Sequence, residues 1–540
     1  MQVSRESGER VGETTESVSL TSGGGSPGRL VDRLPARLAP FVLAGSREGL
    51  ADLPILLAKT VGSALEAASA RGPLPVGRPG LVLAAAAEAL GVARIPEEGV
   101  GSEAALCKVA GALIERGLDL SHPLAAAHLQ PPPLAVAVAA DALASASNAS
   151  LDTYDSGPSA IAIERWLITA LVELAGLGDG ADGVLTPGGS MSNLLGLLLA
   201  RDAAALRRGV DARRDGVRAL PRPVVLCSEL AHFSVQRACA ALGLGEGAVR
   251  LVPSDAERRL DAGILAEMLR GLGPHDTPLA VVATAGTTDF GSIDPLDEIA
   301  NLARTHGVWL HVDAAYGFGT LFSERLAGLV RGLEQADSIT LDLHKLGWQP
   351  AAASVLLVAR AEAFTSLERE VAYLNPSDDA EQGLDGLLGR SLQTTRRLDA
   401  LKVAATFLAH GRRGLGEMVD VCHALAVHAE RCILSEPALE LVAPAVLTTV
   451  VFRFRPPGSA SSVAREDAIQ GMIRRELMER GVALIGRTSV RVAGGGDAAR
   501  VCLKLTLLNP TAGTADIESL LDAVVRVGRA AEQHLEAGCA

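Results

Sequence analysis

Aromatic side chains are scarce in this sequence of 540 residues. Phe, Trp and Tyr together make up 3% of the chain, whereas hydrophobic residues as a class reach 48% and charged residues 21%. These proportions are typical of a folded globular protein and exclude wholesale disorder. The core must therefore consist largely of Leu, Val and Ala, and a chain of this length is expected to form one large domain with smaller additions.

The chain also lacks clustered positive charge, paired cysteine spacings and long apolar runs. Its net charge of -13 argues against a nucleic-acid partner, because phosphate contacts require clustered Lys and Arg. Seven cysteines without a CxxC pair favour a reducing compartment over a disulfide framework, and no metal site is expected. No apolar run reaches the roughly 18 residues of a membrane span, and the N-terminus has no signal-peptide core. We therefore expect a cytoplasmic protein without a membrane partner.

Composition divides the sequence into four parts. Residues 1–29 are rich in Ser, Gly, Glu and Thr, which predicts a disordered tail. Residues 30–150 carry Ala and Leu at helical spacing, which predicts a helical N-terminal segment. Residues 151–402 alternate β-branched and helical runs, the pattern of a large α/β domain, and residues 403–540 predict a small α+β domain.

Within the large domain, five short β-branched runs predict strands of a mainly parallel central sheet flanked by helices. They are residues 224–227, 279–284, 308–313, 338–342 and 353–358. Between the second and third runs, Asp294 is the expected N-cap of a helix with Pro295 at its first position.

The candidate chemistry centres on Lys345, which follows the expected strand 338–342. A lysine held among apolar neighbours at a strand end loses charge through desolvation and becomes a nucleophile able to form an imine. Taken alone, the pair His344-Lys345 is more typical of an exposed surface. The neighbouring motifs therefore decide how it is interpreted.

Asp313 ends another expected strand, in the sequence His-Val-Asp-Ala-Ala that begins at His311. A carboxylate there can pair with a protonated pyridine nitrogen and keep the ring cationic and electron-withdrawing. The alternative is that Asp313 caps a helix, because Ala and Gly residues follow it.

Three further motifs lie at strand ends. Gly189 and Ser190 belong to a Gly-Gly-Ser turn before an apolar helix, where backbone N–H groups bind anions such as phosphate. His232 follows the strand 224–227 and can stack on a flat heteroaromatic ring, and Thr284 begins a Thr-rich turn. Each motif has an ordinary structural explanation. Together with Asp313 and Lys345, they occur where α/β sheets bind ligands.

In this order, the motifs closely resemble those of the group II decarboxylases that depend on pyridoxal 5'-phosphate (PLP). This family has fold type I architecture and includes glutamate, aromatic amino acid and 2,4-diaminobutyrate decarboxylases. The resemblance runs from about His122 to Leu521. Three stretches look most like the bacterial branch that acts on 2,4-diaminobutyrate and on aliphatic, valine-type amino acids: DLHKLGWQP at 342–350, SLQTTRRLDALK at 391–402 and LKLTLLNP at 503–510.

The resemblance implies a role for each candidate residue. Lys345 would hold PLP as a Schiff base, Asp313 would pair with the pyridine nitrogen, and His232 would stack over the ring. The expected catalytic residues are these three and His344. The remaining expected cofactor contacts are Gly189, Ser190, Thr284, Ala315, Asp342 and His344. The family also implies a homodimer in which the N-terminal segment, residues 30–150, serves dimerisation and the active site is built at the subunit interface.

Two stretches depart from the family's pattern. Many members carry a Tyr on a loop after the catalytic Lys, proposed to protonate the carbanion, but residues 376–390 contain none. His232 is then the candidate proton donor, with another group or water as alternatives. Near the substrate, His128-Leu129-Gln130-Pro131 replaces the His-Cys-Pro pattern of diaminobutyrate enzymes. His128, Gln130 and Pro131 are the substrate-facing residues expected here.

We therefore expect decarboxylation of an L-amino acid to its amine and carbon dioxide. The prolines near the substrate and the scarcity of aromatic residues favour a small aliphatic amino acid such as valine or leucine. L-2,4-diaminobutyrate is the alternative substrate. Further alternatives are a decarboxylation-coupled aldehyde synthase, a fold type I aminotransferase and a catalytically silent decarboxylase-like scaffold.

Overall fold

The structure is a computed structural model of the chain and describes residues 42–43, 47–68, 71–455, 462–490 and 499–537. The chain forms two compact units, Met1–Gly62 and Ser63–Ala540, and the boundary falls within helix α1 (Arg47–Ala68). The tail expected over residues 1–29 lies outside the described residues. Within them, no helix combines the length and the apolar composition needed to cross a bilayer.

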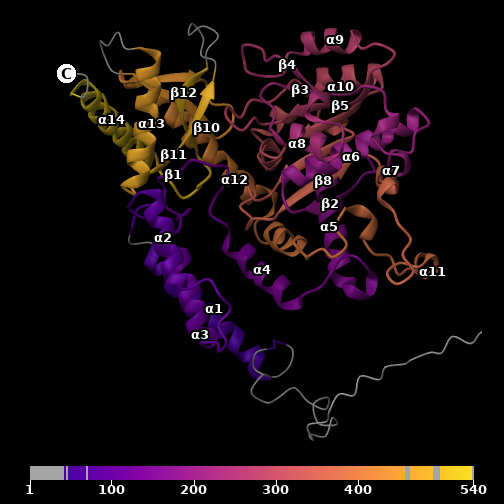
Figure 1. The fold of residues 1–540 in the computed structure, drawn as a ribbon, viewed down its shortest axis with the longest axis horizontal. Helices are drawn as coiled ribbons and strands as arrows, with labels where there is room; N and C mark the ends of the chain where they lie inside the picture. The colour runs from indigo at the N-terminus through magenta and orange to yellow at the C-terminus, as the bar shows by residue number, and fades with distance from the viewer. Residues whose placement is uncertain (1–41, 44–46, 69–70, 456–461, 491–498, 538–540) are drawn as a thin grey trace, which may run out of the picture. The chain divides into compact units, whose positions relative to one another are not determined.

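A seven-stranded sheet is the centre of the unit Ser63–Ala540 (Figure 1). Its strands run in the order β2, β8, β7, β6, β5, β3, β4, and β8 alone is antiparallel to its neighbours. Their bounds are β2 Asp182–Thr186, β3 Pro223–Ser228, β4 Val249–Val252, β5 Thr277–Thr284, β6 Trp309–Asp313, β7 Ser338–Asp342 and β8 Ser354–Val358. The predicted mainly parallel sheet is confirmed, and six strands direct their carboxyl ends to the same edge.

Alternate strand residues pack into two apolar layers on opposite faces of this sheet. On β3, Val224 and Leu226 join the layer that contains helices α5, α9, α10 and the first part of α12. Val225 and Cys227 join the layer of α6 and α8. The bounds are α5 Pro158–Ala175, α6 Gly189–Arg207, α8 Ser234–Ala241, α9 Ala262–Arg270, α10 Leu296–His306 and α12 Ala400–Ser435. Burial on both faces explains why the strands are apolar throughout.

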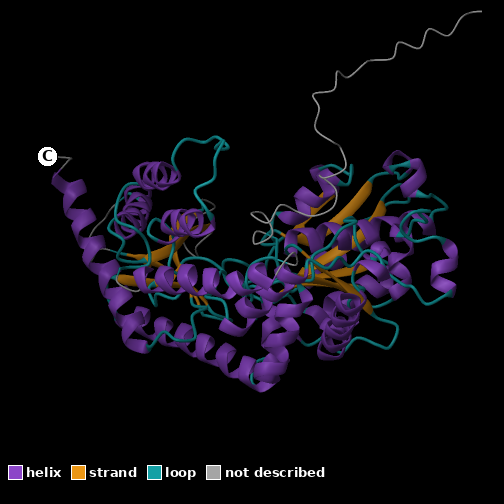
Figure 2. Ribbon diagram, turned by 90° about the horizontal axis from the view of Figure 1, so that it is seen from below, coloured by secondary structure: helices purple, strands orange, loops and turns teal. Residues whose placement is uncertain are grey.

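A second sheet, of five strands, belongs to the C-terminal part of the same unit, and Figure 2 shows the two sheets as separate groups of orange strands. Its order is β1, β11, β12, β10, β9. Helices α13, α14 and the later part of α12 share its apolar core. The bounds are β1 Ala125–Ala126, β9 Leu439–Ala443, β10 Thr449–Phe454, α13 Val463–Glu479, β11 Leu484–Val490, β12 Arg500–Thr506 and α14 Thr514–Ala537.

The helical N-terminal segment is also present, since α2, α3 and α4 lie before the large sheet in the chain. The remaining helices are short. The bounds are α2 Pro79–Leu90, α3 Ser102–Ile114, α4 Ala135–Ser147, α7 Ala212–Asp215 and α11 Ser377–Glu381. The expected domain limit at residue 402 falls inside α12, which is interrupted at Gly411 (φ +61°). The domain limits therefore stay a prediction.

The expected capping role of Asp294 is wrong. Helix α10 begins at Leu296, and no side chain caps its N-terminus. Asp294 instead accepts hydrogen bonds from the backbone N–H groups of Leu260 (2.7 Å) and Thr284 (2.7 Å). Both oxygens thus bind backbone N–H groups outside helix α10, and burial raises the pKa of Asp294 to about 6. Asp294 thereby anchors the end of β5.

Candidate active site

The carboxyl ends of five strands surround a cavity of about 270 Å³. All residues expected at the cofactor line it: Gly189 and Ser190 after β2, His232 after β3, Thr284 at the end of β5, Asp313 and Ala315 at β6, and Asp342, His344 and Lys345 at β7. Because these strands are parallel, residues up to about 150 positions apart meet at one edge.

Asp342 orients the candidate lysine. Lys345 Nζ lies 2.9 Å from Asp342 Oδ2, and the other carboxylate oxygen accepts a hydrogen bond from Ser354 Oγ at 2.5 Å. His344 Nε2 lies 3.6 Å from the same carboxylate, but burial lowers the pKa of His344 and keeps its ring neutral near pH 7. The amino group of Lys345 is therefore held beside the cavity by one carboxylate.

Asp313 is 6% exposed and receives a hydrogen bond on each carboxylate oxygen. Oδ1 accepts from the backbone N–H of Ala315 (3.1 Å), and Oδ2 accepts from Asn193 Nδ2 (2.8 Å). Each oxygen retains a second lone pair that can accept another donor. Asp313 is thus oriented by backbone and side-chain groups and can still bind a cationic N–H in the cavity.

A buried chain of hydrogen bonds extends this arrangement away from the cavity. Trp309 Nε1 donates to Ser338 Oγ (2.8 Å), and Ser338 Oγ lies 2.8 Å from His311 Nδ1. His311 Nε2 lies 3.0 Å from Asn193 Oδ1, which can only accept. His311 therefore carries its proton on Nε2 and accepts at Nδ1. Burial lowers its pKa to about 4, so the ring stays neutral.

The same chain fixes the protonation of His232. Asn193 Nδ2 also donates to Ser234 Oγ (2.8 Å), which frees the Ser234 hydroxyl proton for His232 Nδ1 at 2.8 Å. The backbone N–H of Ser234 donates to the same nitrogen at 3.3 Å. His232 Nδ1 is therefore an acceptor and its proton lies on Nε2. Burial lowers the pKa of His232 and outweighs the opposing effect of Asp313.

The turn before α6 is shaped by the absence of side chains. A Cβ on Gly189 would lie 2.8 Å from Asp342 Oδ1. Gly286, with φ +98°, is equally restricted, since a Cβ there would lie 2.9 Å from the backbone nitrogen of Gly317. Nearby, Thr284 Oγ1 is buried without a hydrogen-bond partner in the described part of the chain. The cavity thus combines a long helix's N-terminus with an unsatisfied hydroxyl.

The expected substrate residues are placed differently from the cofactor set. Leu129 lines the cavity, but its neighbours His128, Gln130 and Pro131 are not among the lining residues. Pro131 is buried, while His128 and Gln130 are exposed. Partial burial, followed by the charges of Lys504 and Arg474, lowers the pKa of His128. Their role toward the substrate stays a prediction.

Sequence analysis missed some cavity residues. Asn193 lies one helical turn after Gly189, in the motif already singled out, and Tyr316 directly follows Ala315. Tyr373 lies three residues before the stretch 376–390 that contains no tyrosine. It is 84% exposed and is not among the residues that line the cavity.

The model of the pyridoxal-dependent decarboxylase conserved domain matches residues 104–455, which is more than half of the chain. This chain belongs to the pyridoxal-dependent decarboxylase family. It is therefore a PLP-dependent amino acid decarboxylase, a carboxy-lyase, and the family expected from the motifs is confirmed.

Individual relatives agree with this assignment. The chain is 42% identical over 443 residues to an L-2,4-diaminobutyrate decarboxylase of Rhizobium meliloti, covering 82% of this chain and 85% of that protein. It is 35% identical to an enzyme of the same name from Acinetobacter baumannii, covering 79% and 84%. A similar solved structure is the glutamate decarboxylase domain of diaminobutyrate-pyruvate transaminase and L-2,4-diaminobutyrate decarboxylase from Vibrio parahaemolyticus. That structure has a TM-score of 0.78 and 31% identity, and the match covers 91% of this chain and 98% of that chain.

The cavity residues fit PLP. The N-terminus of α6 offers backbone N–H groups to a phosphate, and the unpartnered Thr284 hydroxyl has room for an acceptor. Asp313 presents spare lone pairs to a pyridinium nitrogen, and Lys345 presents an amine. When bound, PLP supplies an aldehyde that condenses with amines and a ring that accepts the electron pair left by departing carbon dioxide. Binding of PLP would thus explain why these groups surround one cavity.

Proposed function

We propose that this protein decarboxylates L-2,4-diaminobutyrate, releasing carbon dioxide and 1,3-diaminopropane. The observation that carries the proposal is the 42% identity over 443 residues to the Rhizobium meliloti enzyme of that name. The Acinetobacter baumannii relative supports the same substrate. The alternative named from the sequence thus gains more support than the valine-type reading.

The prediction of a valine-type substrate assumed that the substrate pocket shares the low aromatic content of the whole chain. Aromatic residues are scarce overall, yet His232 and Tyr316 both line the cavity, together with the charged Asp313, Asp342 and Lys345. All but Tyr316 are assigned to the cofactor and its lysine, so these groups do not define the surface that meets the substrate side chain. Overall composition is therefore a poor guide to the side chain that the substrate carries.

In the proposed reaction, Lys345 would hold the cofactor as a Schiff base, and Asp342 would bind the ammonium form of the Lys345 side chain. Asp313, oriented by Asn193, would pair with the pyridine nitrogen and supply the charge that keeps the ring cationic. His232 and Ala315 would contact the ring, and His344 would support Asp342. Gly189, Ser190 and Thr284 would hold the phosphate. The support is their common position around one cavity.

We propose Tyr373, rather than His232, as the group that returns a proton to the substrate carbon. Tyr373 lies on the segment that follows Lys345 in the chain, and its 84% exposure leaves the phenol free to approach a neighbouring cavity. His232 is fixed by Ser234 and is the second candidate, because its Nε2 carries a proton.

The proton donor can be tested by comparing Tyr373→Phe with His232→Asn. A general acid contributes roughly 10²- to 10⁴-fold to a rate, so Tyr373→Phe should lower amine formation by such a factor. Binding of PLP, read from its visible absorbance, should be unchanged. Retention of the amine rate in Tyr373→Phe and its loss in His232→Asn would favour His232 instead. Aldehyde formation by Tyr373→Phe would support the expected oxidative side reaction.

We further propose a homodimer whose N-terminal segment meets the partner subunit. No residue of α2 is buried, and the segment 81–113 exposes a row of large apolar side chains: Leu81, Leu83, Leu90, Val92, Ile95, Val109 and Leu113. Ile95 is 96% exposed. Such an apolar surface is typical of an interface.

The partner subunit is also the proposed source of an acceptor for the substrate's second ammonium group. The acidic residues that line the cavity are Asp313 and Asp342, and both already accept hydrogen bonds or pair with Lys345.

The substrate proposal is tested with purified protein, PLP and a panel of amino acids. L-2,4-diaminobutyrate should give 1,3-diaminopropane with a kcat/KM at least roughly tenfold above L-valine, L-leucine or L-ornithine. Carbon dioxide should appear without a keto acid, which separates decarboxylation from transamination. A higher kcat/KM for valine or leucine would overturn the substrate assignment. Absence of turnover with every substrate would support the silent scaffold.

We propose a cytoplasmic location on the cysteine pattern alone.

A further inference from the structure

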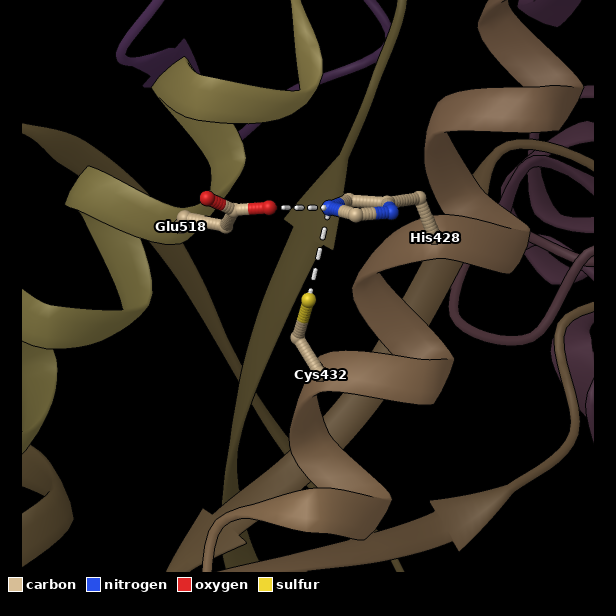
Figure 3. A group of neighbouring side chains, drawn as sticks. All are labelled: His428, Cys432 and Glu518. Atoms are coloured by element: carbon tan, nitrogen blue, oxygen red, sulfur yellow. Dashed lines mark hydrogen bonds and ion pairs between the residues drawn. The ribbon is translucent and has the colours of Figure 1, made fainter.

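Three side chains of types that can bind a metal lie close together between α12 and α14. None of them lines the catalytic cavity. Figure 3 shows His428 and Cys432, one turn apart on α12, converging with Glu518 of α14. His428 Nε2 lies 3.1 Å from Glu518 Oε1 and 3.4 Å from Cys432 Sγ. The three donor atoms all lie within 4.8 Å of one another.

These distances match the spacing of ligands around one small cation. In a tetrahedral zinc site, Zn–N is about 2.0 Å, Zn–S about 2.3 Å and Zn–O about 2.0 Å, so the nitrogen lies roughly 3.5 Å from the sulfur and roughly 3.3 Å from the oxygen. The two separations from His428 Nε2 differ from those values by a few tenths of an ångström, and the third pair of donor atoms lies within 4.8 Å. The three donor atoms are therefore close enough to share one ion.

Hydrogen bonding offers Cys432 only a weak interaction in this cluster. If His428 Nε2 carries a proton, it donates to Glu518 Oε1, and Cys432 Sγ is then a weak acceptor of the same proton. Here both partners approach the same nitrogen. A cation at their meeting point accepts a lone pair from all three groups. Its charge would be balanced by one thiolate and one carboxylate.

We propose that His428, Cys432 and Glu518 form a zinc site that ties the C-terminal helix α14 to α12. The donor set of imidazole, thiolate and carboxylate favours zinc over magnesium or calcium, which prefer oxygen ligands alone. Glu518 is 58% exposed and His428 is 17% exposed, so water can complete the coordination. As the Zn–S bond forms, the thiol proton leaves to solvent, and no electron is transferred.

Burial, together with the charge of Glu518, raises the pKa of Cys432, so the metal-free thiol is protonated at neutral pH. The sequence offers no recognisable metal motif here, because a His and a Cys four residues apart gain their third ligand only when α14 packs on α12. The sequence therefore predicted no metal site, because Glu518 is distant from His428 and Cys432 in the sequence.

The test uses the full-length holoenzyme after dialysis against a chelator, with zinc and cobalt as probes. Zinc titration should show one tight site per chain, and cobalt should give a thiolate-to-metal charge-transfer band. Because even outer-shell partners contribute roughly 10- to 100-fold to metal affinity, Cys432→Ser should weaken zinc binding by at least about 100-fold and abolish the band. Cys107→Ser, which changes an exposed thiol elsewhere, should alter neither.

Glu518→Gln is a second variant, which keeps the side-chain shape at a 58% exposed position, and it should weaken zinc binding while it keeps the cobalt-thiolate band. Zinc should also raise the melting temperature of the wild type but not of Cys432→Ser. Decarboxylation at saturating PLP should be the same in all three variants. Equal zinc affinity in wild type and Cys432→Ser, or a cobalt spectrum without a thiolate band, would overturn the proposal.

Discussion

The strand-end region and the N-terminal stretch at residues 128–131 both approach the cavity, but they are built differently. At the strand ends, each candidate residue follows a buried strand, and its position is set by a sheet whose two faces are packed. In the N-terminal stretch, Leu129 reaches the cavity while the neighbouring His128 and Gln130 are exposed. The residues expected at the cofactor are thus positioned by a packed sheet, whereas the residues expected at the substrate lie on a partly exposed segment.

Among the variants described next, Asp313→Asn in the strand-end region should cause the largest loss of activity. The variant keeps the shape of the side chain but removes the charge that faces the cavity, so decarboxylation should fall by roughly 10²- to 10³-fold, as for other preorganised electrostatic groups. The measurement is kcat with saturating PLP. Asp261→Asn, at the N-cap of α9, should retain full activity because Asn caps helices equally well. Equal activity of Asp313→Asn and wild type would contradict the role of Asp313.

The buried hydrogen-bond chain behind Asp313 should make stability fall on acidification. Burial lowers the pKa of His311 from 6.5 to about 4, so the folded protein disfavours the charged ring. Its contribution is complete above pH 6.5, the unfolded value, and is lost as the pH falls toward 4. At roughly 1.4 kcal/mol per pH unit, the loss is about 3 kcal/mol.

Urea unfolding at several pH values measures this effect. Because other groups titrate in the same range, the wild type is compared with His311→Gln, which should show a shallower dependence between pH 6.5 and pH 4. His410→Gln, at an exposed position, should keep the wild-type dependence. Identical pH profiles for wild type and His311→Gln would show that His311 is not the buried base described here.

Adding a single methyl group at Gly196 should test the packing around His311 in this buried hydrogen-bond chain. A Cβ on Gly196 would lie 2.6 Å from His311 Cε1, so Gly196→Ala should destabilise the protein by about 1–3 kcal/mol and weaken PLP retention. Gly471→Ala on α13 is the matched change, since the nearest atom to its Cβ is Arg487 Nη1 at 3.5 Å. It should be neutral or stabilising. Equal stability of the two variants would contradict the close packing at His311.

The smallest effect is expected in the N-terminal stretch. Gln130 does not line the cavity, so Gln130→Ala should change PLP affinity by no more than about twofold, the range of ordinary surface substitutions. Any effect should appear in KM, because the residue belongs to the segment expected near the substrate. Loss of PLP from Gln130→Ala would erase the contrast between the two regions.

The same contrast explains what could be predicted from the sequence. Lys345, Asp313 and Thr284 follow strands that are short, apolar and continuous in sequence, so local patterns placed them at one edge of the sheet. The carboxylate of Asp294 could not be assigned, because its partners Leu260 and Thr284 become neighbours only in the folded chain. The contacts of Asn193 with His311 and Asp313 likewise join residues more than 100 positions apart.

Lys345 is proposed to carry the cofactor opposite Asp313. Reduction of the holoenzyme with borohydride, followed by peptide mass spectrometry, tests this role most directly. A covalent pyridoxyl group is expected on the peptide that contains Lys345, and none in Lys345→Ala, which should also be inactive. A label on another lysine, or full activity of Lys345→Ala, would contradict it.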